Sequence, residues 1–154
     1  MDSKKPLRRI KELQFLSREH HHTLLLSWKI RTGFQKGVDI SIIKQYVDWF
    51  YNHHIKQHFN MEELHIFPIL GDQHELVKKA NSEHKRLIKL FTTQVDIEKS
   101  LSLLEEELEQ HVRFEERILF KEIQEIATDQ QLKMIEAIHT EEDFIDNTTN
   151  EFWK

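Results

Sequence analysis

The sequence predicts an all-α protein, an up-down-up-down four-helix bundle with a short extra C-terminal helix. Two observations carry this prediction. The 154 residues include only three Gly and two Pro, so few positions are suited to turns. Apolar residues recur three and four positions apart along most of the chain, and no stretch alternates as a half-buried strand would. Short connections between such helices favour the up-down order.

The length fits a single domain, residues 1–154. We expect the bundle over about 7–127, and the extra helix and a tail over 128–154. The first helix of the bundle is expected over about 7–31, where apolar side chains recur at helical spacing.

The next two connections are indicated by residues that end or cap helices. Gly33 and Gly37 indicate the end of the first helix and the loop after it. Asp39 is a suitable N-cap for the second helix, because its side chain can accept a backbone N–H. Pro68 and Gly71 end this helix, since Pro cannot donate to the helical ladder and Gly tolerates the turn that follows.

The second half of the chain repeats this organisation. A third helix is expected over about 75–91, and a fourth over about 103–126, with a poorly marked connection within 92–102. Thr128 and Gln131 form the pattern of a capping box at the start of the short fifth helix. The final stretch TTNEFWK is expected to attach only loosely.

The composition restricts the chemistry. The chain has no Cys, which excludes disulfides, iron–sulfur clusters, thiolate zinc sites and Cys nucleophiles. A metal ion would therefore be held by imidazole and carboxylate groups. This restriction matters because the chain contains eleven His, about threefold more than ordinary residue usage suggests. These His are dispersed along the chain, so they do not form a tag.

The charge and hydropathy patterns bear on partners and location. The formal net charge is −5 and no basic stripe follows a helix, so we expect no nucleic-acid partner. No run approaches the length of a transmembrane helix, and no apolar stretch follows the basic start. We therefore expect no membrane partner and a cytoplasmic location.

Each helix of the bundle carries one His in the middle of its apolar stripe, and two of them add a Glu one turn later. This set comprises His20, His58, Glu62, His84, His111 and Glu115. Burying an unpaired carboxylate is costly, and two in one core are costlier. A metal ion compensates directly, because it binds deprotonated carboxylate and neutral imidazole.

Other His residues remain alternatives. His21 lies at the edge of the first stripe and is the second choice for the ligand from that helix. His54 and His65 also fall on the buried face of the second helix, as extra ligands or as residues that support the ligands. The remaining candidates, His53, His74 and His139, are assigned no role. A single inward His is more often a satisfied hydrogen-bonding residue, and one His-x-x-x-Glu pair is weak evidence.

The set as a whole suits iron, manganese or zinc, because it offers nitrogen and oxygen donors without sulfur. Two Glu on neighbouring helices can bridge two ions, as carboxylates do in the cores of helical bundles. Four His and two Glu exceed what one closed zinc site requires. The surplus favours a dinuclear centre. If the ions are iron, their open positions would bind dioxygen, peroxide or nitric oxide.

Four motifs resemble those of the hemerythrin-like (HHE cation-binding) domain family: LSREHHHTLLL at 16–26, HFNMEELHIFPIL at 58–70, SEHKRL at 82–87 and HVRFEERILF at 111–120. The resemblance covers about residues 14–127. It implies an up-down four-helix bundle around a non-haem di-iron site.

Carried over residue by residue, the resemblance implies ligands on the second, third and fourth helices: His58 with Glu62, His84, and His111 with Glu115. On the first helix the sequence EHHH leaves a choice, and the apolar stripe prefers His20 over His21. Glu63 and Glu116 are expected to rotate away from the ligands, toward solvent or a supporting position.

The chain departs from the oxygen-carrying hemerythrins at two places. Those carriers use two His one turn apart on the third helix, whereas Ala80 and Ile88 stand four residues to either side of His84. They also place an Asp five residues after the His of the fourth helix, whereas Glu115 follows His111 by four. One His of the carrier set is therefore missing, which leaves more open coordination and puts reversible oxygen carriage in doubt.

Three functions follow as hypotheses. The first is a non-haem di-iron protein that binds or senses dioxygen, nitric oxide or iron. The second is a di-iron redox enzyme that turns over peroxide or nitric oxide, or gives iron to damaged clusters, with Tyr51 as a candidate proton donor. The third is a structural bundle without a functional metal. Three aromatic residues are expected near the site, either to dry it or to pack the core: Phe59, Phe67 and Phe114. Two decapeptides within these motifs are similar, HFNMEELHIF at 58–67 and HVRFEERILF at 111–120. Any asymmetry between them is expected at His65, which is expected to point inward where Ile118 lies inward in the other copy.

Overall fold

The structure is a computed structural model that describes residues 8–139 and 143–154, and these residues contain helices and no strand. The α-helices are α1 (Gln14–Gln35), α2 (Ile40–Phe50), α3 (Lys56–Met61), α4 (Glu75–Thr92), α5 (Ile97–Phe114), α6 (Phe120–Ile126) and α7 (Asp129–Ile138). Short 3-10 segments lie at Lys11–Leu13 and Phe67–Ile69. The expected start of the first helix, at residue 7, lies outside the described residues.

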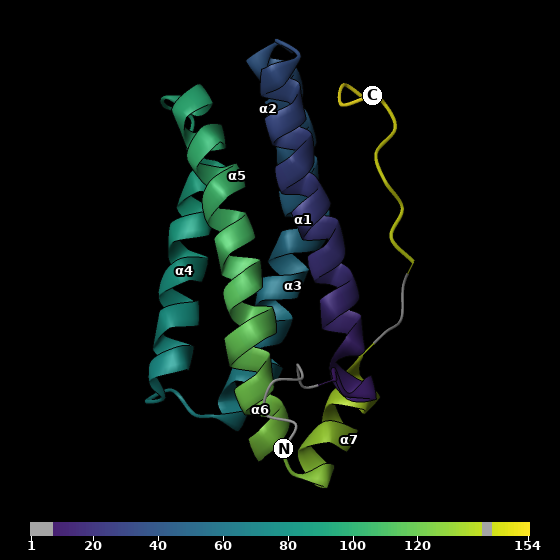
Figure 1. Ribbon diagram of the computed structural model, residues 1–154, viewed down its shortest axis with the longest axis vertical. Coiled ribbons are helices and arrows are strands. Elements are labelled where there is room, and N and C mark those ends of the chain that lie inside the picture. The colour runs from purple at the N-terminus through teal and green to yellow at the C-terminus, as the bar shows by residue number, and fades with distance from the viewer. Residues whose placement is uncertain (1–7, 140–142) are drawn as a thin grey trace, which may run out of the picture.

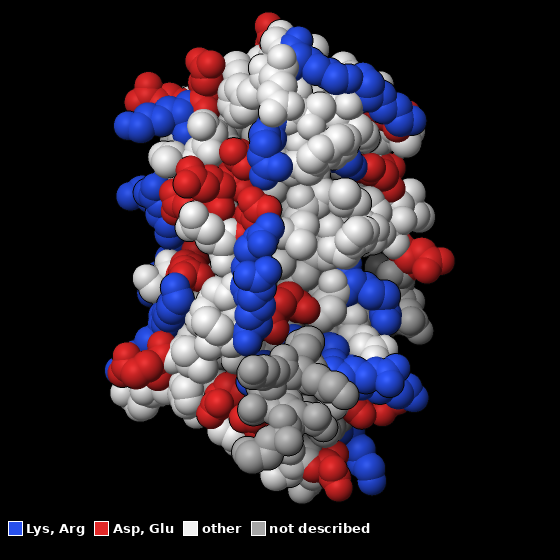
Figure 2. Space-filling model, in the orientation of Figure 1, with Lys and Arg blue, Asp and Glu red and all other residues white. Residues whose placement is uncertain are grey.

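The helices pack along one another. Figure 1 shows α1, the α2–α3 segment, α4 and the α5–α6 segment running along the long axis, with α7 across one end. Contacts join α1 to α5, α4 to α5, and α2 to each of the other long helices. On the face in Figure 2, acidic and basic side chains are interleaved. Within the described ranges, no helix combines the length and hydropathy that crossing a bilayer requires.

Two of the expected helix caps are confirmed and one expected helix end is wrong. Asp39 accepts a hydrogen bond from the backbone N–H of Ser41, and Thr128 with Gln131 forms a complete capping box. Gly33, however, lies inside α1 and is buried. A Cβ at this position would come within 2.8 Å of Ile43 Cδ1, so Gly33 permits close packing of α1 on α2.

Three π-helical turns lie within the α2–α3 and α5–α6 segments, at Tyr51–Ile55, Glu62–Ile66 and Glu115–Leu119. A π turn contains more residues than an α turn, so the helix rotates less per residue across it. The positions that face the core after each π turn therefore lie one residue further along the sequence. His65 and Ile118, expected to face inward, are exposed, whereas the residues that follow them, Ile66 and Leu119, are fully buried.

The core consists of two apolar clusters. One contains Leu26, Phe50 and Leu108, and the other contains Leu16 and Phe120. Along each of the four long segments, the inward polar residues lie between members of the two clusters. The core is therefore divided by a polar layer.

The C-terminal segment is docked, contrary to the expectation of a loose tail. Figure 1 shows it beside α1. Phe152 and Trp153 are each only 8% exposed. The ammonium group of Lys29 lies 4.0 Å from the centre of the Trp153 ring and donates to Asp146 at 2.7 Å. Tyr46 donates to the same carboxylate at 2.6 Å, so a buried polar cluster fixes the segment.

Candidate metal centre

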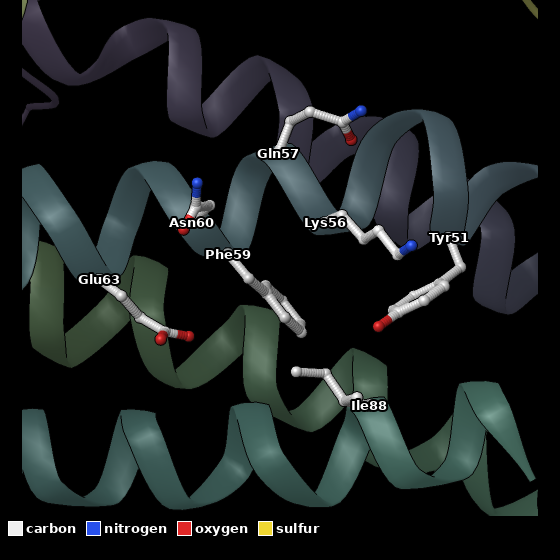
Figure 3. Close-up of a pocket in the computed structure, with 7 residues that line it drawn as sticks. All are labelled: Tyr51, Lys56, Gln57, Phe59, Asn60, Glu63 and Ile88. Carbon is white, nitrogen blue, oxygen red and sulfur yellow. The ribbon is translucent and has the colours of Figure 1, made fainter.

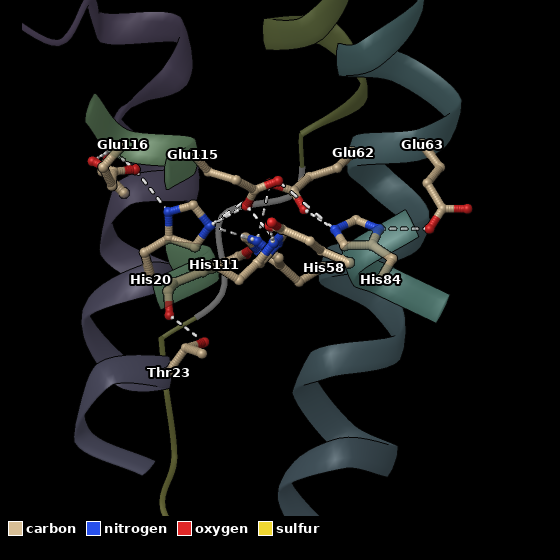
Figure 4. Close-up of polar contacts among 12 residues, drawn as sticks. His20, Thr23, His58, Glu62, Glu63, His84, His111, Glu115 and Glu116 are labelled. Atoms are coloured by element: carbon tan, nitrogen blue, oxygen red, sulfur yellow. Dashed lines mark hydrogen bonds and ion pairs between the residues drawn. The ribbon is translucent and has the colours of Figure 1, made fainter. Parts of the chain in front are cut away.

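The polar layer contains the six residues that the sequence singled out. Their side chains come from α1, α3 with its π turn, α4, and α5 with its π turn, and they converge as Figure 4 shows. None is more than 5% exposed: His20, His58, Glu62, His84, His111 and Glu115. The two Glu are completely buried. Charged groups this deep in a core require compensation from their surroundings.

The six side chains form two overlapping groups that could each hold a metal ion. The first group is His20, His58, Glu62 and Glu115, and the second is Glu62, His84, His111 and Glu115. Within each group, one ligand atom from every residue lies within 4.8 Å of the others. We call these the first and second ion positions. Both contain the same two carboxylates.

The Nε2 atoms of the four imidazoles are turned toward the shared carboxylates. The separations are 2.9 Å from His20 to Glu115, 3.3 Å from His58 to Glu62, 3.1 Å from His84 to Glu62 and 3.3 Å from His111 to Glu115. The Nε2 atoms of His20 and His58 are 3.0 Å apart. One of those two nitrogens must carry a proton while no metal is bound.

The Nδ1 atom of each imidazole meets a second carboxylate on the outer side. The four pairs are His20 with Glu116, His58 with Glu19, His84 with Glu63 and His111 with Glu83, each at 2.7 Å. A carboxylate here accepts the Nδ1 proton, which leaves the lone pair of Nε2 directed at the centre. It also fixes the orientation of the ring.

Two of these outer carboxylates were missed by sequence reasoning. Glu19 and Glu83 directly precede His20 and His84, and this shared Glu-His pair was the signal available. Each of the two Glu reaches the His of a neighbouring helix rather than its own neighbour in sequence. The described contacts repeat in the two halves of the chain, because each half supplies one Glu-His and one His-x-x-x-Glu-Glu.

Glu63 and Glu116 do rotate away from the ligand groups, as expected, but they support ligands rather than only facing solvent. The Glu116 carboxylate accepts from His20 and, at 2.8 Å, from the hydroxyl of Ser17. Its side chain is 29% exposed, and that of Glu63 is 43% exposed. Both supports therefore stand at the boundary between the centre and solvent.

The shared carboxylates both lie at the first position of a π turn, Glu62–Ile66 and Glu115–Leu119. A π turn is costly compared with an α turn and is frequent at functional sites. Here the His and the Glu four residues later share the inner face of the preceding α-helix, and the π turn changes which residues after the Glu face the core.

Charge compensation is visible in the pKa values. Burial alone would lower the pKa of His58, but the carboxylates of Glu62 and Glu19 raise it to about 9. Burial would raise the pKa of Glu115, yet His111 and the other imidazoles hold it well below its usual range. The buried imidazoles and carboxylates of the centre therefore stabilise each other's charged forms. A metal ion would replace the imidazole protons that face the carboxylates.

The hydrogen-bonding inventory fits a metal ion. Five buried atoms of the centre have no hydrogen-bond partner: both Glu62 oxygens, Glu115 Oε2, and the Nε2 atoms of His84 and His111. Unsatisfied buried polar atoms are costly and usually have an explanation such as a bound ion. All five are ligand types for iron, manganese or zinc.

The aromatic surroundings of the two ion positions differ. Phe120 lies 5.3 Å from His20 and Phe67 lies 5.4 Å from His84, between ring centres. Phe59 is additionally stacked on His84, with ring centres 3.8 Å apart and planes at 10°. Phe114 instead lies under the ammonium group of Lys79.

Phe59 and Glu63 also form part of a groove of about 370 Å³, shown in Figure 3. Tyr51, the candidate proton donor, lines the same groove and stacks on Phe91 with ring centres 4.9 Å apart. Lys56 reaches into it beside Tyr51 (Figure 3). The Tyr51 hydroxyl is therefore assigned to this groove rather than to the ligand groups.

The alternative His residues fall outside both ligand groups. His21 and His65 are exposed, so the structure favours His20 on the first helix and gives His65 no place near the centre. His54 is half-buried and contacts the rings of Trp49, Phe50 and Phe144. Among the described residues, no further group of three or more metal-binding side chains was found.

Comparison of the chain with protein-family models, with curated proteins and with solved structures finds no match.

Proposed function

We propose that the protein is a non-haem di-iron protein, an up-down-up-down four-helix bundle whose buried centre binds or senses dioxygen or nitric oxide. The observation that carries the proposal is the pair of ligand groups sharing Glu62 and Glu115. Each group offers two imidazoles and two carboxylates, and such carboxylates bridge ions in bundle cores. The choice of iron rests on the resemblance to hemerythrin-like domains.

The number of donors leaves open positions on iron but not on zinc. Four protein donors at each position would complete the tetrahedron of a structural zinc ion. An iron or manganese ion with an octahedral preference keeps open positions with the same donors. Iron supplies reversible electron transfer and an open position for a small ligand. The protein supplies the fixed imidazoles, the paired carboxylates and a buried environment.

The outer carboxylates define what the chain contributes. Glu19, Glu63, Glu83 and Glu116 hold the four rings and increase their basicity toward a metal. Together with the two shared carboxylates, they would offset the positive charge of two divalent ions. This support favours ions that stay bound over ions that are stored briefly and released. Sensing of iron itself is the alternative that the loading experiment also tests.

The test is anaerobic loading of chelator-treated protein with ferrous iron. We expect two ions per chain, one for each ligand group. Exposure to dioxygen should then produce the near-ultraviolet charge-transfer absorption of a coupled ferric pair, and nitric oxide should change the spectrum of the ferrous protein. Prior chelation is essential, because zinc competes well for these ligands.

Other outcomes separate the rival functions. Steady consumption of peroxide or nitric oxide would show that the protein is a di-iron redox enzyme rather than a binding protein. A structural bundle without functional metal predicts less than one iron per chain, no absorption band, and a melting temperature that chelation leaves unchanged. That combination would overturn the proposed function.

A further inference from the structure

A cavity of about 450 Å³ lies directly beside the first ion position. Its wall includes Glu19 and His58, which are hydrogen-bonded to each other at 2.7 Å. The rest of the wall comes from α1, from the π turn and helix of the α2–α3 segment, and from residues near the C-terminal segment. The cavity therefore reaches the outer carboxylate of a metal ligand.

The cavity is rich in imidazole. His22, His53, His54 and His139 line it in addition to His58. Three nitrogens among them are buried and have no hydrogen-bond partner: Nδ1 of His22, Nε2 of His54 and Nε2 of His139. Buried polar atoms without partners are uncommon in folded proteins and call for an explanation such as a bound group.

Aromatic stacking holds these rings in place. His22 is stacked on Phe144, with ring centres 4.0 Å apart, and His54 lies 4.7 Å from the same ring. His139 is stacked on Phe15 at 3.8 Å. The stacking occupies a face of each ring but uses none of its nitrogens. The unpartnered nitrogens therefore remain available to donate an electron pair to a bound cation.

We propose that this cavity is the entry site of the metal, in which a divalent transition-metal ion is captured by imidazole before it reaches the first ion position. The proposal rests on the proposed function, since it needs a metal centre to supply. Neutral imidazole suits iron, zinc and manganese ions. Glu19 and Asp143 in the wall outnumber the single cationic side chain, Arg18, and so favour a cation.

The cavity is built for passage rather than for storage. Within the described part of the chain, its histidines do not form a group of three ligand atoms within 4.8 Å, whereas the centre forms two such groups. An ion in the cavity would therefore bind weakly, through one or two imidazoles and water. The Glu19 side chain is 48% exposed, and its carboxylate is hydrogen-bonded to His58. It is therefore the first carboxylate that an ion would meet on its way from the cavity to the centre.

The groove beside the second ion position is less suited to entry. The groove in Figure 3 approaches the second ion position at Phe59 and Glu63. The Phe59 ring covers His84 at 3.8 Å, and the ammonium group of Lys56 lies in the groove. The apolar cover disfavours an approaching cation, and Lys56 offsets the negative charge that Glu63 brings to the groove.

The experiment measures the rate of cobalt(II) loading into metal-free protein by stopped-flow absorption. The variant combines His22→Gln with His54→Gln. The control is His65→Gln, which changes an exposed His in the same helical segment as His54. At low cobalt, we expect the double variant to load several-fold more slowly, because it lacks two of the imidazoles that would capture the ion. The control should load at the wild-type rate. Final stoichiometry should be equal in all three, which also shows that each is folded.

A second measurement covers the case in which the double variant does not fold. Wild-type protein with its centre filled by zinc receives additional zinc, and the imidazole nitrogen signals are recorded by NMR. The signals of His22 and His54 should shift before that of His65. Equal loading rates, or the absence of these selective shifts, would overturn the entry site. If wild-type protein takes up two ions in either case, the proposed function stands without the entry site.

Discussion

The two ion positions have equivalent ligands and different surroundings. Each position has two imidazoles, the shared pair of carboxylates, and outer carboxylates at 2.7 Å from the imidazole Nδ1 atoms. Behind the first position lies a histidine-lined cavity bordered by residues near the C-terminal segment. Against the second lies the ring of Phe59.

The difference shows which features follow from the repeated decapeptides HFNMEELHIF and HVRFEERILF and which do not. The repeat supplies ligands, outer carboxylates and the terminal aromatic residues, Phe67 and Phe120, on both sides. The second residue of the decapeptide is Phe59 in one copy and Val112 in the other. The functional asymmetry is therefore expected here and at the cavity, and not at the exposed His65.

The largest effect is expected from removing what the two positions share. Glu62→Ala combined with Glu115→Ala deletes a carboxylate pair that belongs to both ligand groups, so bound iron should fall from two ions per chain to fewer than one. Iron per chain and the charge-transfer absorption provide the measurement. A matched control replaces two exposed glutamates, Glu106 and Glu125, with Ala and should retain both ions. Retention of a dinuclear spectrum in the first variant would disprove the bridging assignment.

The next effect separates the two positions. Glu19 supports His58 of the first position, and Glu83 supports His111 of the second. Loss of such a support usually reduces metal affinity by about 10–100-fold. Competition with a coloured chelator should show that Glu19→Ala weakens one ion and Glu83→Ala the other. If each variant weakens both ions equally, the two positions are not independent enough for the comparison to hold.

A smaller effect is expected from making the surroundings alike. Phe59→Val gives residue 59, which lies against the second ion position, the same side chain as Val112, the corresponding residue of the other decapeptide. Without the stacked ring, His84 becomes more accessible to water, so a chelator should remove the second ion several-fold faster. The release phase to follow is the one that Glu83→Ala affects. An unchanged phase would show that Phe59 only packs the core.

The smallest effect concerns the C-terminal segment near the first position. Burial raises the pKa of Asp146, but hydrogen bonds from Lys29 and Tyr46 outweigh it and leave the pKa below its usual value. A lowered pKa stabilises the fold above the usual value of about 3.9, and this contribution is lost as the pH falls through the lower folded value.

Asp146→Asn should therefore reduce the free energy of unfolding by about 1 kcal/mol at neutral pH, a hydrogen-bond contribution discounted for the partial exposure of the carboxylate. Denaturant titration of metal-free protein should show the difference from wild type shrinking below about pH 4. The exposed Asp72→Asn serves as the control. A difference that stays constant across this range would exclude the ionised carboxylate as the cause.

The helical class and the six inward residues could be predicted because they depend on local periodicity. His20, His84 and their counterparts lie where a helical stripe of apolar residues places them, and Asp39 and Thr128 act through neighbouring backbone groups. The π turns could not be predicted in this way, since a sequence stripe assumes a constant rotation per residue. This assumption placed His65 and Ile118 inside.

Features that depend on distant parts of the chain were also missed. The pairing of Glu19 with His58 and of Glu83 with His111 joins residues on different helices. The burial of Trp153 depends on Lys29, which lies more than a hundred residues earlier in the sequence. No local pattern marks such contacts. The Glu-His pairs did contain a usable signal, because both halves of the chain carry them.

Anomalous diffraction at the iron absorption edge, from crystals of the iron-loaded protein, tests the central claim most directly. Two peaks per chain are predicted, one between His20 and His58 and one between His84 and His111, both next to the shared carboxylates. A single peak, or iron bound away from Glu62 and Glu115, would contradict a dinuclear centre.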